Sequence, residues 1–220
     1  MKSLMERLKD KKRIRGFIVS YYIIGFAGMV FPLTKPFFEQ LTGLTILISF
    51  ALMMLYHEGW TMRFIVASSL IYIAGFAVEA AGVQTGEVFG HYAYHTSLGP
   101  RIMGTPLLIG INWLMLIYAV YHIVNPIRIH TFAKPFIGAL LMVLYDYLLE
   151  PVAIHWNMWK WGGTVVPVRN YFAWFLISLL FLALMQVLKI KYRNGISTLI
   201  IIAQCCFFLL LNLYLILTGL

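Results

Sequence analysis

The sequence predicts an all-α integral membrane protein, a polytopic bundle of about seven transmembrane helices. Of its 220 residues, 61% are hydrophobic and only 11% are charged, and the mean hydropathy is +0.84. The apolar residues gather in continuous runs, each about the 17–25 residues that a helix needs to cross the hydrocarbon layer. These runs do not alternate with period two, as the strands of an outer-membrane barrel would. We therefore expect a multi-pass protein of the cell membrane.

The predicted spans follow one another along the whole chain, with no soluble domain between them. They cover residues 14–34, 38–56, 62–80, 104–124, 134–150, 170–188 and 196–217. A basic segment at residues 1–15 precedes the first span, and no signal-peptide cleavage site follows it, so we expect the first helix to be retained. Residues 1–220 are thus predicted to form a single transmembrane domain.

Basic residues are divided unequally between the two sides of these spans. All but four of the 17 Lys and Arg lie in the N-terminal segment or in the loops after the second, fourth and sixth spans. The four on the other side are Lys35, Arg101, Lys160 and Arg169. The positive-inside rule then predicts a cytoplasmic N-terminus and an external C-terminus. These flanking residues explain the net charge of +9, so the lipid bilayer rather than nucleic acid is the expected partner.

Three carboxylic acids lie within or at the ends of predicted spans, where ionisable side chains are costly. Glu79 ends one apolar run, and Asp146 and Glu150 lie near the end of another. An ionisable group in a membrane span is a candidate functional site by default. Spacing i, i+4 places Asp146 and Glu150 on one helix face, where like charges repel. We therefore expect one of them to hold a proton or to meet a cation such as Arg169 or Arg101, a structural ion pair being the alternative.

The ends of these acid-bearing helices are less sharply defined by the sequence. Pro151 follows Glu150 directly and is expected to end that helix. Gly82 and Gly86 follow Glu79 and make a continuous helix to Glu87 doubtful, so Glu87 is interpreted as an exposed loop residue. His57 and Glu58 fall on the cytoplasmic side and are interpreted as interfacial.

The two longest connections are on the predicted external side and contain most of the remaining unusual residues. Both are rich in Gly, aromatic and titratable residues, which is not typical of a solvated loop. Their aromatic candidates for substrate contact are Tyr92, Tyr94, Trp156, Trp159 and Trp161. An aromatic belt at the membrane interface is the alternative interpretation of each. We expect these connections to form walls or lids of a site.

Several kinds of chemistry lack their sequence signature. His91 and His95 form a single H-x3-H pair, and no second cluster of histidines accompanies it. There is no P-loop, dinucleotide-binding fingerprint, nucleophile elbow or Asp-rich diphosphate motif. The adjacent Cys205 and Cys206 lie in the last span and have no metal-ligand spacing. We therefore expect neither a metal nor a cofactor.

The residues around the acids resemble the signature of a known family. The first block reads Glu79-x-x-Gly82-x-x-Thr85-Gly86-x-x-Phe89-Gly90-x-Tyr92-x-Tyr94, then Leu98-Gly99, Gly104-x-Pro106 and Trp113. The second block reads Asp146-x-x-x-Glu150-Pro151, then Trp159-x-Trp161, Pro167, Asn170 and Trp174. Together these blocks, in residues 79–174, resemble the membrane carotenoid biosynthesis protein family. That family includes carotenoid 1,2-hydratases of the bisanhydrobacterioruberin hydratase and γ-carotene 1'-hydroxylase type.

The resemblance implies cofactor-free hydration of an acyclic carotenoid end group, in which water adds across the terminal C1–C2 double bond and leaves a tertiary alcohol. The substrate would be an acyclic or monocyclic carotenoid, such as lycopene, γ-carotene or a C50 relative. A neutral carboxylic acid would protonate C2, aromatic faces would stabilise the cation at C1, and a carboxylate would accept a proton from water. We expect Asp146 or Glu150 to be the acid and Glu79 to be its partner or the base that orients the water, with the exchange of these roles as the alternative.

The remaining candidate residues and alternative functions complete these expectations. Asn170 and Thr85 are candidates for holding water, and Trp113 completes the expected binding residues.

Lycopene cyclisation is one alternative to hydration, because it begins from the same protonated end group. A proton-coupled transporter would also contain intramembrane acids but often shows inverted repeats, which we do not find. A receptor or a structural subunit is the non-catalytic alternative, and the sequence leaves the oligomeric state open.

Overall fold

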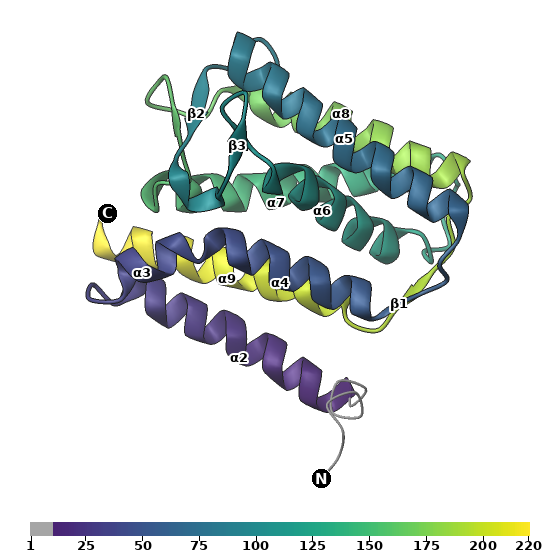
Figure 1. Ribbon diagram of the computed structural model, residues 1–220, viewed down its shortest axis with the longest axis horizontal. Helices are drawn as coiled ribbons and strands as arrows, with labels where there is room; N and C mark the ends of the chain where they lie inside the picture. Colours follow the sequence, from purple (N-terminus) through teal and green to yellow (C-terminus); the bar gives the residue numbers. More distant parts are fainter. Residues whose placement is uncertain (1–10) are drawn as a thin grey trace.

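The computed structural model describes residues 11–220, which form an α-helical bundle with short paired strands in its connections (Figure 1). The helices are α2 (Lys11–Val30), α3 (Lys35–Gln40), α4 (Thr42–Leu55), α5 (Met62–Thr85), α6 (Leu108–Val124), α7 (Ala133–His155), α8 (Val168–Val187) and α9 (Ser197–Thr218), with a 3-10 turn η1 (Thr96–Leu98). Most of the basic segment predicted at residues 1–15 lies outside the described residues.

Each predicted span corresponds to one helix, which confirms the all-α fold. Among residues 11–220, five helices are long and apolar enough to cross a membrane, namely α2, α5, α7, α8 and α9. The other two, α4 and α6, are shorter apolar helices. Large apolar side chains remain exposed along the bundle, for example Ile23 at 60% and Leu180 at 68%. Such a surface suits lipid acyl chains rather than water.

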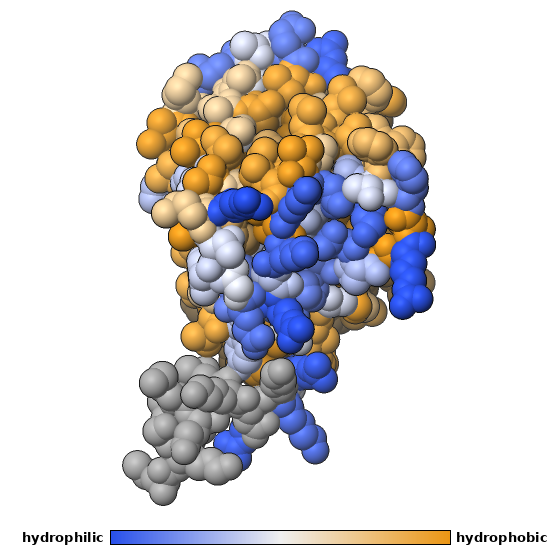
Figure 2. Space-filling view, turned by 90° about the vertical axis from the view of Figure 1, so that its right-hand side faces the viewer, coloured by the Kyte–Doolittle hydropathy of each residue, from blue (hydrophilic) through white to orange (hydrophobic). Residues whose placement is uncertain are grey.

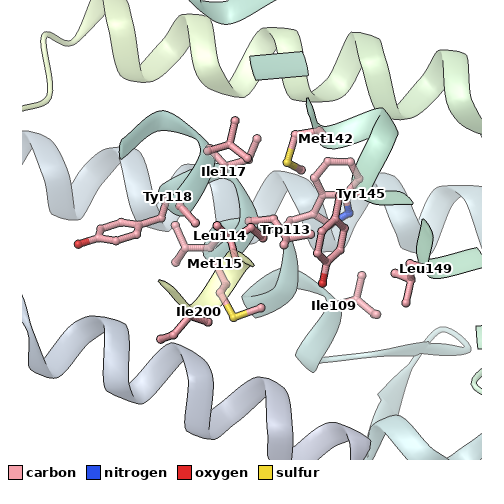
Figure 3. Packing of buried hydrophobic residues seen from close by; sticks show 14 of the residues in the cluster. Ile109, Trp113, Leu114, Met115, Ile117, Tyr118, Met142, Tyr145, Leu149 and Ile200 are labelled. Carbon is pink, nitrogen blue, oxygen red and sulfur yellow. The ribbon is translucent and has the colours of Figure 1, made fainter. Parts of the chain in front are cut away.

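Helix α6 is the centre of the bundle and packs against α4, α5, α7, α8 and α9. Every residue from Trp113 to Tyr121 is buried. A helix that is apolar on all faces can be buried on all faces. Although α6 has only 17 residues, it can therefore contact five other helices at once. Figure 3 shows Trp113 and Met115 of α6 close to Tyr145 of α7 and Ile200 of α9.

Close packing between α5 and α6 depends on a glycine. A Cβ built at Gly75 would lie 2.8 Å from the Cβ of Trp113, closer than real side chains approach. Small residues at such positions let the backbones of membrane helices come together. Gly75 therefore determines how deeply Trp113 sits against α5.

Short antiparallel strand pairs join the connections at opposite ends of the bundle (Figure 1). At one end β1 (His57–Glu58) pairs with β6 (Arg193–Asn194), and at the other β2 (Tyr92–Tyr94) pairs with β5 (Trp159–Trp161). A third pair, β3 (Arg101–Ile102) with β4 (Thr105–Pro106), is a local hairpin.

The end of the bundle with β1 and β6 carries basic side chains. Exposed ones are Arg63, Arg128, Lys189, Lys191 and Arg193. Figure 2 faces this end and shows hydrophilic residues gathered within an otherwise hydrophobic surface. The folded chain thus gathers the loops that the charge pattern assigned to the cytoplasm, while the orientation in the membrane stays a prediction.

Two helices extend further than the sequence suggested. Helix α7 does not end at Glu150 but continues through Pro151 to His155. The proline removes one backbone hydrogen bond, but the continued helix buries Val152 and Ala153 completely, which offsets that loss. Helix α5 likewise continues through Gly82 and ends at Gly86, whose φ of +69° is the left-handed cap that glycine favours.

Candidate active site

Strands β2 and β5 come from different connections and together place four aromatic side chains near the acids. Their register pairs Tyr92 with Trp161 and Tyr94 with Trp159. Successive side chains on a strand point to opposite faces, and the central pair, Ala93 with Lys160, is exposed. The four aromatic residues therefore share the face that meets the bundle.

Glu79 of α5 is the carboxyl group with the most hydrogen bonds in this region. Its Oε2 accepts from the hydroxyls of Tyr92 (2.5 Å) and Tyr94 (2.9 Å), and its Oε1 accepts from Nε1 of Trp113 (2.9 Å). Burial, with the neighbouring Glu79 carboxyl, raises the pKa of both tyrosine hydroxyls. Both therefore remain protonated donors at neutral pH, and Glu79 is surrounded by donors suited to a carboxylate.

Glu150 of α7 is held by the other strand. Its Oε2 accepts from Nε1 of Trp159 (3.1 Å) and of Trp161 (2.8 Å), and only 2% of the residue is exposed. No described residue donates a hydrogen bond to Oε1. One oxygen of Glu150 is therefore fixed by indole donors and the other remains available.

Asp146 lies one turn before Glu150 on α7 and is the least satisfied of the three acids. Its Oδ2 accepts from Nδ2 of Asn170 (2.6 Å), a residue in the first turn of α8. Its Oδ1 is buried and has no partner among the described residues. A buried carboxyl oxygen without a partner is costly, and such atoms are rare in folded proteins, which makes Asp146 a candidate functional residue.

The three acids line one cavity. Its volume is about 30 Å³, which is room for a water molecule. The other lining residues are Phe89, Tyr92, Tyr94, Ile109, Asn112, Leu149, Trp159, Trp161, Asn170 and Trp174. The cavity thus combines carboxyl and amide groups with aromatic faces, and it lies near the β2–β5 end of the bundle.

The expected cation partners do not reach these acids. Arg101 donates to the carbonyl oxygen of Tyr94 (2.8 Å), and Arg169 pairs with the exposed Glu87 at 3.4 Å. Neither salt bridge found within residues 11–220 involves a cavity acid. Neutral Tyr, Trp and Asn donors occupy the positions that an arginine would need. In the same part of the chain, no group of three or more His, Cys, Asp or Glu side chains is arranged to hold a metal ion.

Three of the predicted binding residues do not line the cavity. Trp156 donates to the carbonyl oxygen of Met29 (3.3 Å) and so packs against the end of α2. Thr85 is exposed and its hydroxyl donates to the carbonyl oxygen of Ala81 (2.7 Å). Trp113 lies behind Glu79 and stacks on Trp174 with ring centroids 4.3 Å apart. Tyr92, Tyr94, Trp159, Trp161 and Asn170 do line it.

Sequence reasoning gave no role to Asn112 or Trp174, which also line the cavity. Asn112 is a half-buried amide within the apolar helix α6, and a polar residue inside a span is itself a signal of function. Trp174 belongs to the second motif block, and its position on α8 brings it against Trp113. Both could have been selected by asking which polar or aromatic residues lie on helices next to the acids.

The fold and the cavity define a polytopic membrane protein with a buried carboxyl site bounded by aromatic residues. Residues 40–219 match the model of the carotenoid biosynthesis protein family, and the chain belongs to this family. The match confirms the resemblance seen in residues 79–174 and extends it to α4 and α9, while α2 lies outside it. No curated protein and no solved structure matches the chain.

Proposed function

We propose that this protein is a carotenoid 1,2-hydratase, which adds water to the terminal double bond of an acyclic carotenoid end group without a cofactor. One observation carries the proposal. Two acids on one helix face, Asp146 and Glu150, line a cavity with room for water, and each has one carboxyl oxygen without a hydrogen-bond partner among residues 11–220. A proton donor and a proton acceptor are what hydration of an alkene requires.

We assign the proton donor to Asp146. Within the described part of the chain it accepts a single hydrogen bond, from Asn170, and forms no salt bridge, so the neutral acid is the form that its surroundings favour. Its proton adds to C2 of the substrate. The electron pair of the C1–C2 double bond forms the new C–H bond, which leaves a tertiary cation at C1.

Aromatic faces and the remaining carboxylates support that cation. Tyr92, Trp159 and Trp161 line the cavity, and each face stabilises a desolvated cation by about 0.5–2 kcal/mol. Glu79 lies at the same cavity, and the three hydrogen bonds that it accepts favour its negatively charged carboxylate form. The aromatic faces and the carboxylate both stabilise the positive charge that develops in the transition state, and this lowers the barrier to the reaction.

Water then attacks C1, and Oε1 of Glu150 accepts the proton that the water loses. We place the base here rather than at Glu79, because both oxygens of Glu79 already accept hydrogen bonds. Asp146 has lost one proton and Glu150 has gained one. Transfer between these neighbours, one helical turn apart, restores the starting state, and the net change is the addition of one water molecule.

The polar groups of the cavity favour hydration over cyclisation. A cyclase must keep water away from the cation until another double bond of the substrate attacks it, and this requires a dry site. Here the side chains of Asn112 and Asn170 line the cavity beside the acids and are suited to hold water. This is the observation on which we choose between the two reactions.

The proposal is tested by producing the protein in a bacterial host that makes lycopene or γ-carotene and analysing the pigments by liquid chromatography with mass detection. We expect a product heavier by one or two water molecules. Asp146→Asn should abolish it, whereas Glu87→Gln should not, because Glu87 is an exposed acid outside the cavity. An isomer of unchanged mass would mean cyclisation, and unaltered pigment with normal amounts of membrane protein would contradict hydration of these substrates.

A further inference from the structure

The acid cavity is the first in a series of neighbouring cavities. A second cavity of about 80 Å³ shares four lining residues with it, namely Ile109, Asn112, Leu149 and Trp159. The carboxyl groups stop at this boundary, since none of the described residues that line the second cavity is an acid. The second cavity therefore adjoins the acid cavity and offers a more apolar environment.

The second cavity leads in turn toward the outer surface. A third cavity, also about 80 Å³, shares Tyr22, Met29, Thr45 and Phe207 with the second. A groove of about 310 Å³ shares Tyr22 and Phe207 with the third. The groove is formed by α2 and α9, and two of its lining residues are largely exposed, Ile23 at 60% and Ile202 at 52%. The series of cavities therefore ends at the apolar outer surface of the bundle.

Two rings separate the groove from the inner cavities. Tyr22 and Phe207 contact each other edge to face, with centroids 5.9 Å apart. Tyr22 is anchored by a hydrogen bond between its hydroxyl and that of Ser49 (2.8 Å), whereas the apolar side chain of Phe207 is held by packing alone. Phe207 can therefore move without breaking a hydrogen bond.

The shape and chemistry of this series fit one kind of occupant. A carotenoid has a reactive end group on a long, narrow and fully apolar chain, and the cavities place acids at one end and apolar walls along the rest. Resting on the hydratase function proposed above, we propose that the second and third cavities hold the polyene chain. The substrate enters them from the lipid through the groove between α2 and α9, past a gate formed by Tyr22 and Phe207. Helix α2 contributes Tyr21, Tyr22 and Ile24 to the wall of the third cavity.

Binding of the polyene is measured separately from turnover. The full chain carrying Asp146→Asn is purified from a lycopene-producing host, and the lycopene retained per protein is read from visible absorbance. Ala203→Phe fills the groove, and Gly25→Phe fills the third cavity, where even a Cβ would lie 3.5 Å from the ring of Phe207. We expect each to lower retained lycopene about tenfold, since pockets that lose space for a hydrocarbon discriminate on that scale.

The matched control is Ala27→Phe, an identical substitution at an exposed position of α2 that lines none of the four cavities. It should retain as much lycopene as the Asp146→Asn parent. Phe207→Ala removes the mobile part of the gate and should speed the transfer of lycopene from donor liposomes into the protein. Equal retention in Ala203→Phe, Gly25→Phe and Ala27→Phe would overturn the channel.

The two proposals fail in distinguishable ways. If unsubstituted protein hydrates lycopene, and the two filling substitutions leave retention unchanged in the Asp146→Asn parent and product unchanged when introduced without Asp146→Asn, the channel is wrong and the hydratase stands. If the filling variants lose lycopene but unsubstituted protein gives no hydrated product, the channel is supported and the hydratase is wrong.

Discussion

Tyr92 and Trp161 face each other across the β2–β5 pair, and their side chains donate to carboxyl groups on two different helices. The rings are 5.1 Å apart, and Tyr92 donates to Glu79 of α5 while Trp161 donates to Glu150 of α7. One strand register therefore determines the relative position of two acids that are 71 residues apart in the numbering. The β2–β5 strand pair thus sets the relative positions of the acids in the candidate site.

Removing one indole donor should impair the reaction without removing an aromatic face. Trp161→Phe loses the 2.8 Å hydrogen bond to Glu150, and hydrogen bonds to charged groups contribute about 1.5–3 kcal/mol, or about 10–100-fold in rate. We expect hydrated product to form more slowly by that factor. Lys160→Met is the control, because Lys160 lies on the same strand with its side chain exposed. Equal rates for both variants would argue against a role for the indole donor.

The tyrosine donors should act together on Glu79. Tyr94→Phe removes a 2.9 Å hydrogen bond to the Oε2 that Tyr92 also contacts, so we expect about a 10–100-fold loss of hydration rate. Because both hydroxyls serve one oxygen, Tyr92→Phe with Tyr94→Phe should cost a different amount from the sum of the two single changes. Tyr147→Phe, at a position that is 62% exposed, should change nothing. Strict additivity would indicate that the two hydroxyls act independently.

Gly75→Ala should destabilise the bundle, because the new methyl group would lie 2.8 Å from the Cβ of Trp113. Overpacking of this kind costs about 1–3 kcal/mol. Thermal unfolding in detergent should show a lower midpoint. Gly16→Ala is the matched control, since a Cβ there meets nothing within 4 Å. A displaced Trp113 would also weaken its hydrogen bond to Glu79, so Gly75→Ala should lose activity at temperatures where it remains folded.

His57 should make the folded state sensitive to mild acid. Burial lowers the pKa of its imidazole, its Nδ1 is hydrogen-bonded to the hydroxyl of Tyr118 (2.9 Å), and its Nε2 has no partner among the described residues. The unfolded chain then binds a proton more readily than the folded one, so stability rises with pH. The contribution is complete above the ordinary histidine pKa of about 6.5 and is lost as pH falls through it toward the folded value.

The measurement is the unfolding midpoint between pH 5 and pH 8, taken for unsubstituted protein and His57→Gln. Unsubstituted protein should lose more stability on the acid side than the variant. Parallel curves would show that His57 does not contribute to the acid sensitivity.

The helices could be predicted from sequence because a membrane span is recognised by continuous hydrophobicity over a fixed length. Their ends were predicted less well at α5 and α7. Pro151 is a helix breaker by local preference, but burial of Val152 and Ala153 outweighs that preference in α7. Helix α5 continues through Gly82, which is buried, and ends only at the cap formed by Gly86. The helix preference of a single residue does not show which residues will pack against a neighbouring helix.

The candidate site was predicted in part. Glu79, Asp146 and Glu150 were selectable because a carboxyl group in a span is costly wherever it points. Trp156 and Trp159 looked equivalent in sequence, yet Trp159 meets Glu150 and Trp156 meets the end of α2. Arg169 and Arg101 were plausible partners for the acids until the fold placed them on Glu87 and the carbonyl of Tyr94.

The sequence by itself determined the membrane class, the helical spans, the family resemblance and the three acids, because each depends on composition, spacing or the cost of burying charge. Only the tertiary structure decided which groups meet. The Tyr-x-Tyr and Trp-x-Trp segments became facing strands, and α2 and α9 came together to bound a groove. Such contacts join residues far apart in the chain, and their geometry results from the packing of all helices at once rather than from any local preference.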